Sequence, residues 1–307
     1  MDSETRPLVV ILGPTGVGKS GVALGLAVKF HGEIINADSM QVYKGFDIGT
    51  DKPAPADRRT VPHHLLDVAE PGDQLTAADF VAGALTAMKG IEKRGGVPFV
   101  VGGTGLYIKA LLDGLFPGPG RNPEVRRRLE EEAAKDGLEA LFRRLEVVDP
   151  AYAQKIRARD RIRIVRALEV FETTGKPISE HFRSTESFVG DRRQVRIGIE
   201  LDRPTLVRRI EERVDRMFAA GLIEEVEQIL AGGVAADAPA FKGLGYRQVL
   251  SFLRNEIGLD EALDLVKRET RRYAKRQMTW FRKMTGISWF APDDKPALED
   301  HMGKNIQ

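Results

Sequence analysis

The 307-residue chain is 42% hydrophobic and 30% charged, which is the composition of a globular protein large enough to bury a substantial core. It contains no cysteine, which excludes disulfides, thiolate metal sites and a cysteine nucleophile. The formal net charge of +2 means that any nucleic-acid partner must be bound by local basic patches. No apolar run is long enough to span a membrane, and residues 1–6 are too polar for a signal peptide. We therefore expect a cytoplasmic protein with no membrane partner.

A glycine-rich motif follows the first apolar run. Residues 8–12 predict a strand, residues 21–29 predict a helix, and a G-x4-G-K-S pattern lies between them. Backbone N–H groups of such a loop bind phosphate oxygens, its lysine adds positive charge, and its Ser hydroxyl can bind Mg2+. The candidate residues for binding a diphosphate or a nucleotide such as ATP are Gly13, Pro14, Thr15, Gly16, Val17, Gly18, Lys19 and Ser20. The motif indicates a di- or triphosphate ligand but not which bond is broken.

A second short strand, residues 33–38, ends in the carboxylate of Asp38. Ligands of open parallel sheets bind beyond the carboxyl ends of the strands, so Asp38 should lie beside the phosphate loop. Three roles are equally open for it: organising Mg2+, acting as a general base, or forming a turn or helix cap. Residues 39–59 are rich in Gly, Pro and Asp and predict a long loop, which in a compact domain is usually functional.

Strands and helices then alternate. We predict a strand at residues 62–67, a helix capped by Thr76 that runs to about Arg94, and a buried strand at residues 97–101 before a Gly-Gly-Thr-Gly segment. A strand at residues 195–201 should rejoin the sheet. Amphipathic helices follow over residues 204–283, with breaks at Gly221, residues 232–233 and residues 243–245, and then a short strand at residues 287–290. This pattern predicts an α/β fold, a P-loop NTPase-like three-layer core with a parallel sheet.

The middle of the chain differs in composition. Residues 116–120 are rich in Pro and Gly and predict a linker, and residues 122–188 are helical and densely charged with no strand-like run. We therefore predict a catalytic core of residues 1–120 and 190–307, with a small all-helical insertion at residues 121–189.

Basic residues form two clusters. The first, within the predicted insertion, contains Lys155, Arg157, Arg159, Arg161, Arg163 and Arg166. The second, on a C-terminal helix that also carries Tyr273 and Trp280, contains Arg271, Arg272, Lys275, Arg276, Arg282 and Lys283. Each cluster alone is most simply a solvated face, whereas two clusters in one phosphate-binding protein favour a polyanion such as RNA.

Three further features have both a functional and a structural interpretation. The loop at residues 242–247 could approach a nucleic-acid backbone, with Tyr246 and Arg247 stacking on a base or binding a phosphate, or could simply connect two helices. The adjacent His63 and His64 would face opposite sides of a strand, so we expect structural roles rather than a metal site. Met217 and Phe218 are expected in a helix core.

Together these motifs resemble the bacterial tRNA dimethylallyltransferases, also called tRNA isopentenyl transferases. The resemblance covers nearly the whole chain. It is carried by the phosphate loop and by residues 37–50, 52–53, 62–67, 102–107, 166–170, 245–247 and 273–280. Ser20 stands where many members have Thr, which keeps the hydroxyl.

This resemblance implies transfer of a dimethylallyl group from dimethylallyl diphosphate to N6 of adenosine 37, in tRNAs that read codons beginning with U. The product would be N6-(dimethylallyl)adenosine, with diphosphate released. It implies Mg2+ as cofactor, the tRNA anticodon stem-loop as macromolecular substrate, and a phosphate loop that binds a diphosphate leaving group rather than ATP. We also expect a monomer.

The resemblance also assigns roles to residues. The catalytic residues would be Asp38, as general base, with Thr15 and Thr104. Arg213 would bind the diphosphate together with the loop, and Ser20 would bind Mg2+, with Asp38 as a second candidate. The residues implied to bind tRNA are Asp38, Ser39, Met40, Gln41, Thr104, Arg126, Ile162, Arg163, Ile164, Val165, Arg166, Lys242, Gly243, Leu244, Gly245, Tyr246 and Arg247.

Two alternatives remain at this point. In a small-molecule kinase, the helical insertion would be an ATP lid whose arginines bind phosphate. In a nucleotide-gated RNA-binding module, there would be no chemistry. Turnover of a nucleotide without an organic product would favour the first, and RNA affinity without turnover of any phosphate donor would favour the second.

Overall fold

The computed structural model describes residues 6–116 and 118–306. The polar segment at residues 1–5 and Pro117, which belongs to the predicted linker, lie outside the described residues. The chain divides into two compact units. The first contains the residues up to Ala110 and those from Asp191 onward, and the second is Leu111–Gly190. The role of the predicted insertion at residues 121–189 stays a prediction.

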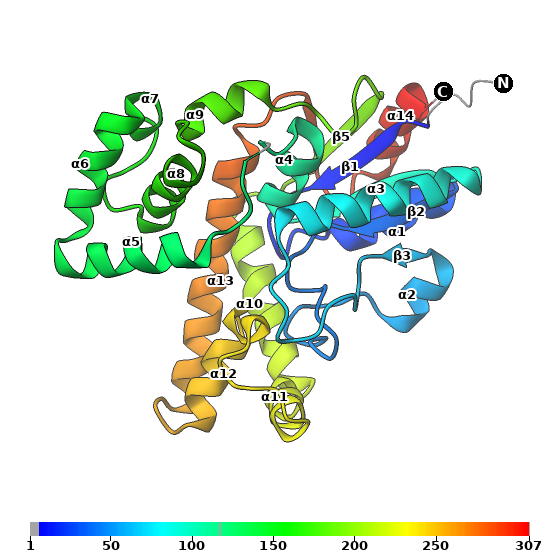
Figure 1. Ribbon diagram of the computed structural model, residues 1–307. Helices are drawn as coiled ribbons and strands as arrows, with labels where there is room; N and C mark the ends of the chain where they lie inside the picture. The colour runs from blue at the N-terminus through cyan, green and yellow to red at the C-terminus, as the bar shows by residue number, and fades with distance from the viewer. Residues whose placement is uncertain (1–5, 117, 307) are drawn as a thin grey trace. The chain divides into compact units, whose positions relative to one another are not determined.

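The first unit is built on one parallel sheet (Figure 1). Its strands are β1 (Leu8–Leu12), β2 (Gly32–Asn36), β3 (His63–His64), β4 (Val97–Gly102), β5 (Gln194–Ile199) and β6 (Ile287–Phe290). Their order is β3-β2-β4-β1-β5-β6, and every neighbouring pair is parallel. All residues of β1 and β4 are buried, as expected of strands covered on both faces. The predicted α/β fold with a parallel sheet is confirmed.

Helices cover the two faces of this sheet. On one face, α1 (Lys19–Lys29) and α14 (Lys295–Ile306) pack against inward-facing residues such as Ile11 and Phe99. Helix α3 (Ala77–Lys93) also contacts β2 and β4, but its buried residues are not part of the core cluster that α1 and α14 form with the sheet. It therefore covers the other face. Thr76 caps α3: it accepts a hydrogen bond from the Asp79 N–H, and Asp79 accepts one from the Thr76 N–H. The predicted cap is therefore confirmed.

Four α-helices lie between β5 and β6 in the first unit: α10 (Arg203–Ala219), α11 (Leu222–Ala231), α12 (Tyr246–Leu253) and α13 (Leu259–Phe281). A short 3-10 turn, η2 (Pro239–Lys242), precedes α12. The helices end near the predicted glycine breaks, and α10 and α13 run side by side (Figure 1). Met217 is buried in their core and Phe218 packs against it, as expected.

Several element boundaries were predicted wrongly. The long loop ends early because α2 (Pro55–Thr60) begins at a proline, which favours a first helical turn. The strand predicted at residues 62–67 has only two residues, because Leu65 and Asp67 take left-handed backbone angles, with φ of +61° and +54°. Neither α14 nor the break before α13, where Asn255 has φ of +57°, was predicted.

The second unit is helical over its described residues. It contains α5 (Pro123–Lys135), α6 (Leu138–Val148), α7 (Pro150–Ala153), α8 (Arg161–Thr174), α9 (Ile178–His181) and the 3-10 turn η1 (Phe182–Ser184). The unit boundary falls within α4 (Gly105–Asp113). Apolar residues spaced by three or four along α5, α6 and α8 form its core, including Leu129, Leu141 and Leu168.

Within the described part of the chain, no helix combines the length and the apolar character that crossing a bilayer requires.

Candidate active site

The phosphate loop connects β1 to α1. Gly16 has φ of +80°, and a Cβ atom there would lie 2.9 Å from Ile210 Cγ1 on α10, so both the backbone angle and the space require glycine. Lys19 and Ser20 are the first residues of α1, and the first turn of this helix carries no acidic side chain. The positive end of the helix therefore remains available to an anion.

Lys19 lies within this loop and donates a hydrogen bond from Nζ to the carbonyl oxygen of Pro14, at 2.8 Å. Burial lowers the pKa of the Lys19 ammonium to about 8, although the negative charge of Asp38 opposes that change. The nearby cation of Arg213 lowers the pKa of Lys19 further. The lysine is thus held in a position where a bound phosphate would favour its charged form.

Asp38 follows β2 and is positioned by local hydrogen bonds. Its Oδ1 accepts from the Met40 N–H at 2.8 Å, and its carbonyl oxygen accepts from Asn36 Nδ2 at 3.3 Å. Asn36 is buried and also donates to the carbonyl oxygen of Leu65, at 3.1 Å. The turn-forming role that the sequence allowed for Asp38 is therefore observed. It uses one carboxylate oxygen and does not conflict with a role in proton transfer or metal binding.

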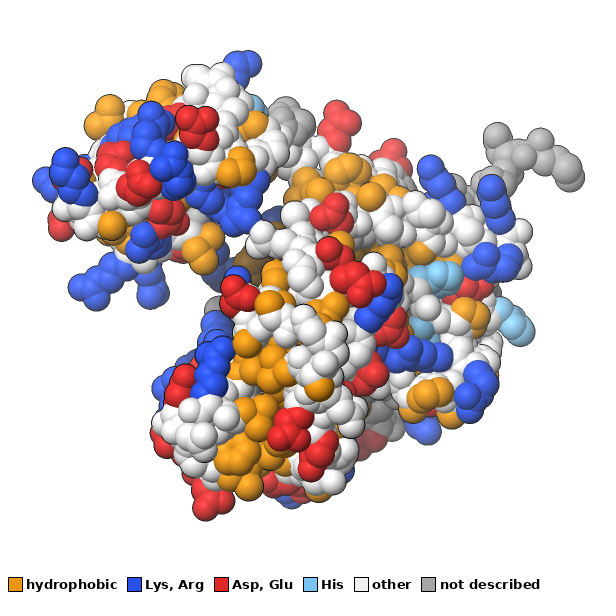
Figure 2. All heavy atoms as spheres, turned by 60° about the horizontal axis from the view of Figure 1, so that its bottom comes forward, with side chains coloured by type: hydrophobic (Ala, Val, Ile, Leu, Met, Phe, Trp, Pro, Cys, Tyr) orange, Lys and Arg blue, Asp and Glu red, His pale blue; other side chains and the backbone are white. Residues whose placement is uncertain are grey.

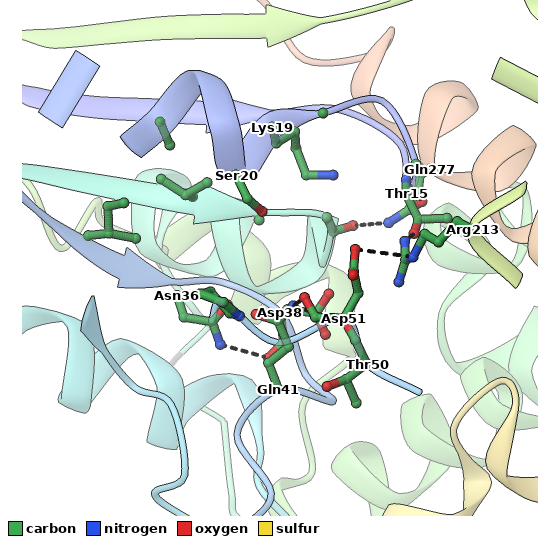
Figure 3. Close-up of a pocket in the computed structure, with 18 of the residues that line it drawn as sticks. Thr15, Lys19, Ser20, Asn36, Asp38, Gln41, Thr50, Asp51, Arg213 and Gln277 are labelled. Atoms are coloured by element: carbon green, nitrogen blue, oxygen red, sulfur yellow. Dashed lines mark hydrogen bonds and ion pairs between the residues drawn. The ribbon is translucent and has the colours of Figure 1, made fainter. Parts of the chain in front are cut away.

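The phosphate loop and Asp38 line a common pocket of about 450 Å3 (Figure 3). Figure 3 shows Lys19 and Ser20 on one side of it and Asp38, Thr50 and Asp51 facing them. The other lining residues come mainly from the ends of β2 and β4 and from one face of α10; among them are Thr15, Gly16, Gly18, Asn36, Gln41, His63, Gly102, Gly103, Arg209, Glu212, Arg213, Arg216 and Gln277.

A second pocket, of about 290 Å3, shares part of its wall with the first. The residues common to both are Thr15, Asp38, Thr50 and Arg213. The second pocket is more apolar, and its further lining residues are Ser39, Met40, Gly49, Val214, Met217, Lys242, Gly243, Leu244, Tyr246, Arg247, Val266, Thr270, Tyr273 and Arg276. The pocket that contains the phosphate loop and the more apolar pocket therefore meet at these four residues, of which Thr15, Asp38 and Arg213 carry the groups that could take part in chemistry.

Arg213 and Gln277 hold Thr15 at this junction. Arg213 donates from Nη1 to Thr15 Oγ1, and its Nε lies 3.2 Å from Asp51 Oδ2 without the geometry of a hydrogen bond. The Thr15 N–H donates to Gln277 Oε1 at 2.9 Å. A buried guanidinium Nε without an acceptor, beside a phosphate loop, is the arrangement expected of a site that binds an anion.

Gln277 explains one of the glycines that the sequence singled out. Its Nε2 donates to the carbonyl oxygen of Gly103 at 2.8 Å, and a Cβ atom on Gly103 would lie only 2.3 Å from that nitrogen. The Gly-Gly-Thr segment therefore lets α13 approach the end of β4. The third residue, Thr104, accepts a hydrogen bond from the Ser39 N–H at 3.0 Å, which supports the turn after Asp38.

One residue of the predicted tRNA-binding loop has a different role. Tyr246 is fully buried, and its hydroxyl donates to Glu225 Oε1 at 2.6 Å. Its ring has no exposed surface in this structure, although Tyr246 is among the residues that line the second pocket, and its predicted contact with tRNA stays a prediction. Lys242 and Arg247 have exposed side chains at the second pocket, and Arg247 has only a long 3.9 Å ion pair with Glu269.

The predicted tRNA-binding residues of the second unit differ in exposure. The side chains of Ile164 and Val165 are buried in its helical core, so their predicted contact with tRNA would have to come from the backbone. They lie on the inner face of α8, because core residues recur every three or four positions along an amphipathic helix. Ile162 is 77% exposed, and Arg163 is also exposed. Figure 2 shows Lys and Arg side chains, with Asp and Glu between them, over the visible surface of this unit.

Arg126 and Arg166 of this unit surround a buried carboxylate. Glu169 is fully buried; its Oε1 accepts from the Asn122 N–H at 2.7 Å and its Oε2 from Arg166 Nη1 at 3.0 Å. Arg126 Nη2 lies 3.6 Å from the same Oε2. Both arginines therefore compensate a buried charge, whatever else they bind.

Sequence reasoning missed Asp51, Thr270, Tyr273 and Gln277, all of which line the pockets. The last three recur at intervals of three and four residues along α13, so they share one helix face. That spacing was visible in the sequence. Asp51 had no such signal, because it lies in a loop whose course depends on distant contacts.

His63 and His64 make local contacts, and His63 also lines the first pocket. His63 Nδ1 lies 2.8 Å from the carbonyl oxygen of Val61, and His64 Nε2 lies 2.7 Å from Glu33 Oε2. Over residues 6–116 and 118–306, no group of three or more acidic or histidine side chains could hold a metal ion. The hydroxyl of Ser20, with the carboxylates of Asp38 and Asp51 in the same pocket, nevertheless fits Mg2+, which commonly takes few protein ligands beside substrate phosphates and water.

Comparison with known proteins agrees with this geometry. The pattern of the IPP transferase family matches residues 41–284. The chain is 50% identical to the tRNA dimethylallyltransferase of Geobacter metallireducens over 289 residues, which are 94% of this chain and 93% of that protein. It belongs to the tRNA dimethylallyltransferase family.

Other relatives and structures support this membership. The tRNA dimethylallyltransferase of Geobacter sulfurreducens is 50% identical over 94% of this chain and 92% of its own length. The full-length tRNA isopentenylpyrophosphate transferase of Bacillus halodurans is 37% identical, with a TM-score of 0.72 over 98% of this chain and 97% of that one. A eukaryotic dimethylallyltransferase acting on tRNA gives a TM-score of 0.81 at 28% identity, over 97% of this chain and 77% of that one. The family resemblance is thus confirmed, and the kinase and the module without chemistry lose their support.

The pKa of Lys19 leads to a pH prediction. We expect Lys19 to favour a bound diphosphate only when it is protonated, so the affinity of this pocket for a diphosphate should fall as pH rises through about 8. Between pH 7 and pH 9 we expect the affinity for inorganic pyrophosphate, measured by calorimetry at fixed Mg2+, to fall about tenfold relative to Lys19→Arg. The arginine variant stays charged throughout and controls for the titration of pyrophosphate itself. Parallel pH curves for the two proteins would contradict the assignment.

Proposed function

We propose that this chain transfers the dimethylallyl group from dimethylallyl diphosphate to N6 of adenosine 37 in tRNAs that read codons beginning with U, forming N6-(dimethylallyl)adenosine and releasing diphosphate. The observation that carries the proposal is the meeting of two pockets at Thr15, Asp38 and Arg213. One pocket has the donors and charge for a diphosphate, and the other is apolar enough for a base and a prenyl chain. Family membership supplies the substrate class.

In this proposal the diphosphate lies on the phosphate loop. Negative charge develops on it as the bond to C1 of the dimethylallyl group breaks, and the loop amides, Lys19 and Arg213 are already aimed at that position. Thr15, which donates its backbone N–H to Gln277 and accepts from Arg213 at its hydroxyl, would lie near the bridging oxygen. Bound Mg2+ would neutralise part of the diphosphate charge, with Ser20 as its protein ligand and Asp38 as a second candidate.

Asp38 would act as the general base. The N6 amine of adenine is a weak nucleophile because its lone pair is delocalised into the ring, so removal of its proton assists attack. Asp38 lines both pockets and has one oxygen engaged by the Met40 N–H, which fixes the direction of the carboxylate. Thr104 would assist by holding Ser39 beside it.

The target base must leave the anticodon stack to enter the second pocket. We propose that Ser39, Met40, Gln41 and the rim residues Lys242 and Arg247 guide it there, with the backbone of Gly243, Leu244 and Gly245 alongside. We further propose that the exposed basic residues of the second unit bind phosphates of the anticodon stem. A tRNA substrate implies action in the cytoplasm, and we expect a monomer.

The reaction can be tested directly. Purified protein and Mg2+ are mixed with an unmodified anticodon stem-loop that carries adenosines at positions 36 to 38, and dimethylallyl diphosphate or ATP is supplied in parallel. Mass spectrometry should show the gain of one dimethylallyl group with the prenyl donor only, and none when guanosine replaces adenosine 37. If the folded protein modifies the RNA with neither donor, the transferase proposal is wrong.

Substitution of Asp38 tests the base. In Asp38→Asn the side-chain amide oxygen would still accept the Met40 N–H but could not take a proton, so this variant should keep RNA affinity and lower the rate about 10²-fold or more. Because Asp38 raises the pKa of Lys19, the substitution lowers that pKa further below about 8, so the comparison belongs below pH 7, where Lys19 keeps more of its charge in both proteins. Asp237→Asn, at an exposed position, is the matched control. A turnover near that of the wild type would exclude Asp38 as the base.

The basic surface of the second unit is tested best away from Glu169, because Arg166 compensates that buried charge. Within the described residues, Arg157 and Arg159 are exposed and have no acidic partner. Arg157→Gln with Arg159→Gln should weaken RNA binding and lower the salt slope by about 0.7 to 0.9 for each lost phosphate contact. Lys135→Gln with Arg143→Gln removes equal charge from α5 and α6 as a control. Equal effects of the two double variants would indicate a non-specific solvated face.

A further inference from the structure

The loop of residues 47–51 contributes to both pockets of the first unit. Gly49 and Thr50 line the second pocket, and Thr50 and Asp51 line the first. The loop contains no helix or strand, so its shape depends on the contacts that its backbone makes with the rest of the unit.

Gln41 Nε2 donates to the carbonyl oxygens of Thr50 and Asp51, at 3.1 and 3.2 Å, and Glu225 of α11 contacts the first half of the loop. Glu225 Oε2 accepts from the N–H groups of Asp47 and Ile48, at 3.0 and 2.7 Å. Its Oε1 lies 3.4 Å from the Gly49 nitrogen, so one carboxylate accepts from three successive amides. Successive N–H groups that point to one side form a concave site for negative charge, and here the anion is a side chain of the protein itself.

Tyr246 of α12 completes the arrangement. Its hydroxyl donates to Glu225 Oε1 at 2.6 Å and accepts from the Gly49 N–H at 3.1 Å. Its ring packs on Phe46 with the centroids 4.6 Å apart, and a Cβ atom on Gly49 would lie 2.6 Å from the ring. Burial and the charge of Glu225 raise the pKa of Tyr246, so its hydroxyl stays a donor across the working pH range.

The far end of the loop reaches the junction of the two pockets. Asp51 Oδ2 lies 3.2 Å from Arg213 Nε, and Arg213 in turn donates to the Thr15 hydroxyl. A path of direct contacts therefore runs from Glu225, through the loop backbone and Asp51, to the two residues proposed to act on the leaving group.

We propose that Glu225, supported by Tyr246, is a positioning residue that holds the loop of residues 47–51 and thereby places Arg213 and Thr15 for the transfer reaction. The inference rests on the proposed function for its kinetic consequence. Neither side chain touches the reacting atoms: Glu225 lines neither pocket, and Tyr246 contributes only a buried ring to the second.

The chemistry of the contact requires a carboxylate. A carboxylate only accepts hydrogen bonds and can face three N–H donors and a hydroxyl, whereas an amide would point its own NH2 donors at them. Glu225→Gln should therefore disturb the loop although it changes the shape of the side chain very little. Glu224→Gln, at the exposed neighbouring position in α11, is the matched control.

The first measurement needs no turnover. Hydrogen exchange of a peptide covering residues 44–53 should become at least tenfold faster in Glu225→Gln and less so in Tyr246→Phe, with no change in Glu224→Gln. If the exchange in Glu225→Gln matches that of the wild type, the carboxylate does not hold the loop and the proposal fails.

The second measurement is kinetic. Glu225→Gln should lower kcat at least tenfold and change KM for dimethylallyl diphosphate less than threefold, because Lys19 and the rest of the phosphate loop still bind this substrate, whereas Arg213 and Thr15 act mainly on the charge that develops as the bond breaks. In an Asp51→Asn background the same substitution should lower kcat less than twofold, since the path to Arg213 is already broken. If the kcat losses of the two single variants add up in the double variant, the role of Glu225 is merely structural. The same conclusion follows if the loss of kcat matches a fall in the folded fraction measured by thermal unfolding.

Failure of the two proposals would look different. A wild-type protein that prenylates no RNA would overturn the proposed function, while the exchange measurement would still decide whether Glu225 holds the loop.

Discussion

The contacts of Thr15 connect the phosphate loop to the C-terminal third of the chain. Its N–H donates to Gln277, 262 residues away, and its hydroxyl accepts from Arg213, 198 residues away. These two side chains come from α13 and α10, the helices that run beside each other next to the carboxyl edge of the sheet. A phosphate loop can bind a diphosphate without such contacts. The hydrogen bonds from Arg213 and to Gln277 give Thr15 one orientation at the junction of the pockets.

The electrostatics of the site follow from the same arrangement. Burial lowers the pKa of Lys19, Arg213 has a buried Nε with no hydrogen-bond acceptor, and both cations face the pocket that contains the loop. Asp38 and Asp51 offset part of this positive charge. A diphosphate would supply the remaining negative charge, so the donors need little reorganisation when it binds or leaves. The neighbouring pocket is lined by Val214, Met217 and Val266 and suits uncharged groups.

The residues implied to bind tRNA divide into two physical classes. Arg163, Lys242 and Arg247 are exposed and can meet a phosphate without disturbing the fold. Arg126, Arg166 and Tyr246 already compensate or complete buried polar groups, at Glu169 and Glu225, so their removal would cost stability as well as any contact with RNA. A loss of activity in variants of the second class would therefore not by itself indicate an RNA contact.

The sequence by itself determined the parallel α/β core, the phosphate loop, the position of Asp38 beside it and the family. These features depend on local patterns: buried apolar runs, glycine spacing, and a carboxylate at a strand end. The tertiary structure alone decided that Ile164, Val165 and Tyr246 face inward, that Asp51 lines the site, that Gln277 reaches Thr15, and that Glu225 contacts a distant loop. Which side of a helix is buried, and which loop a side chain reaches, depends on partners far away in the chain, and no local pattern of residues records them.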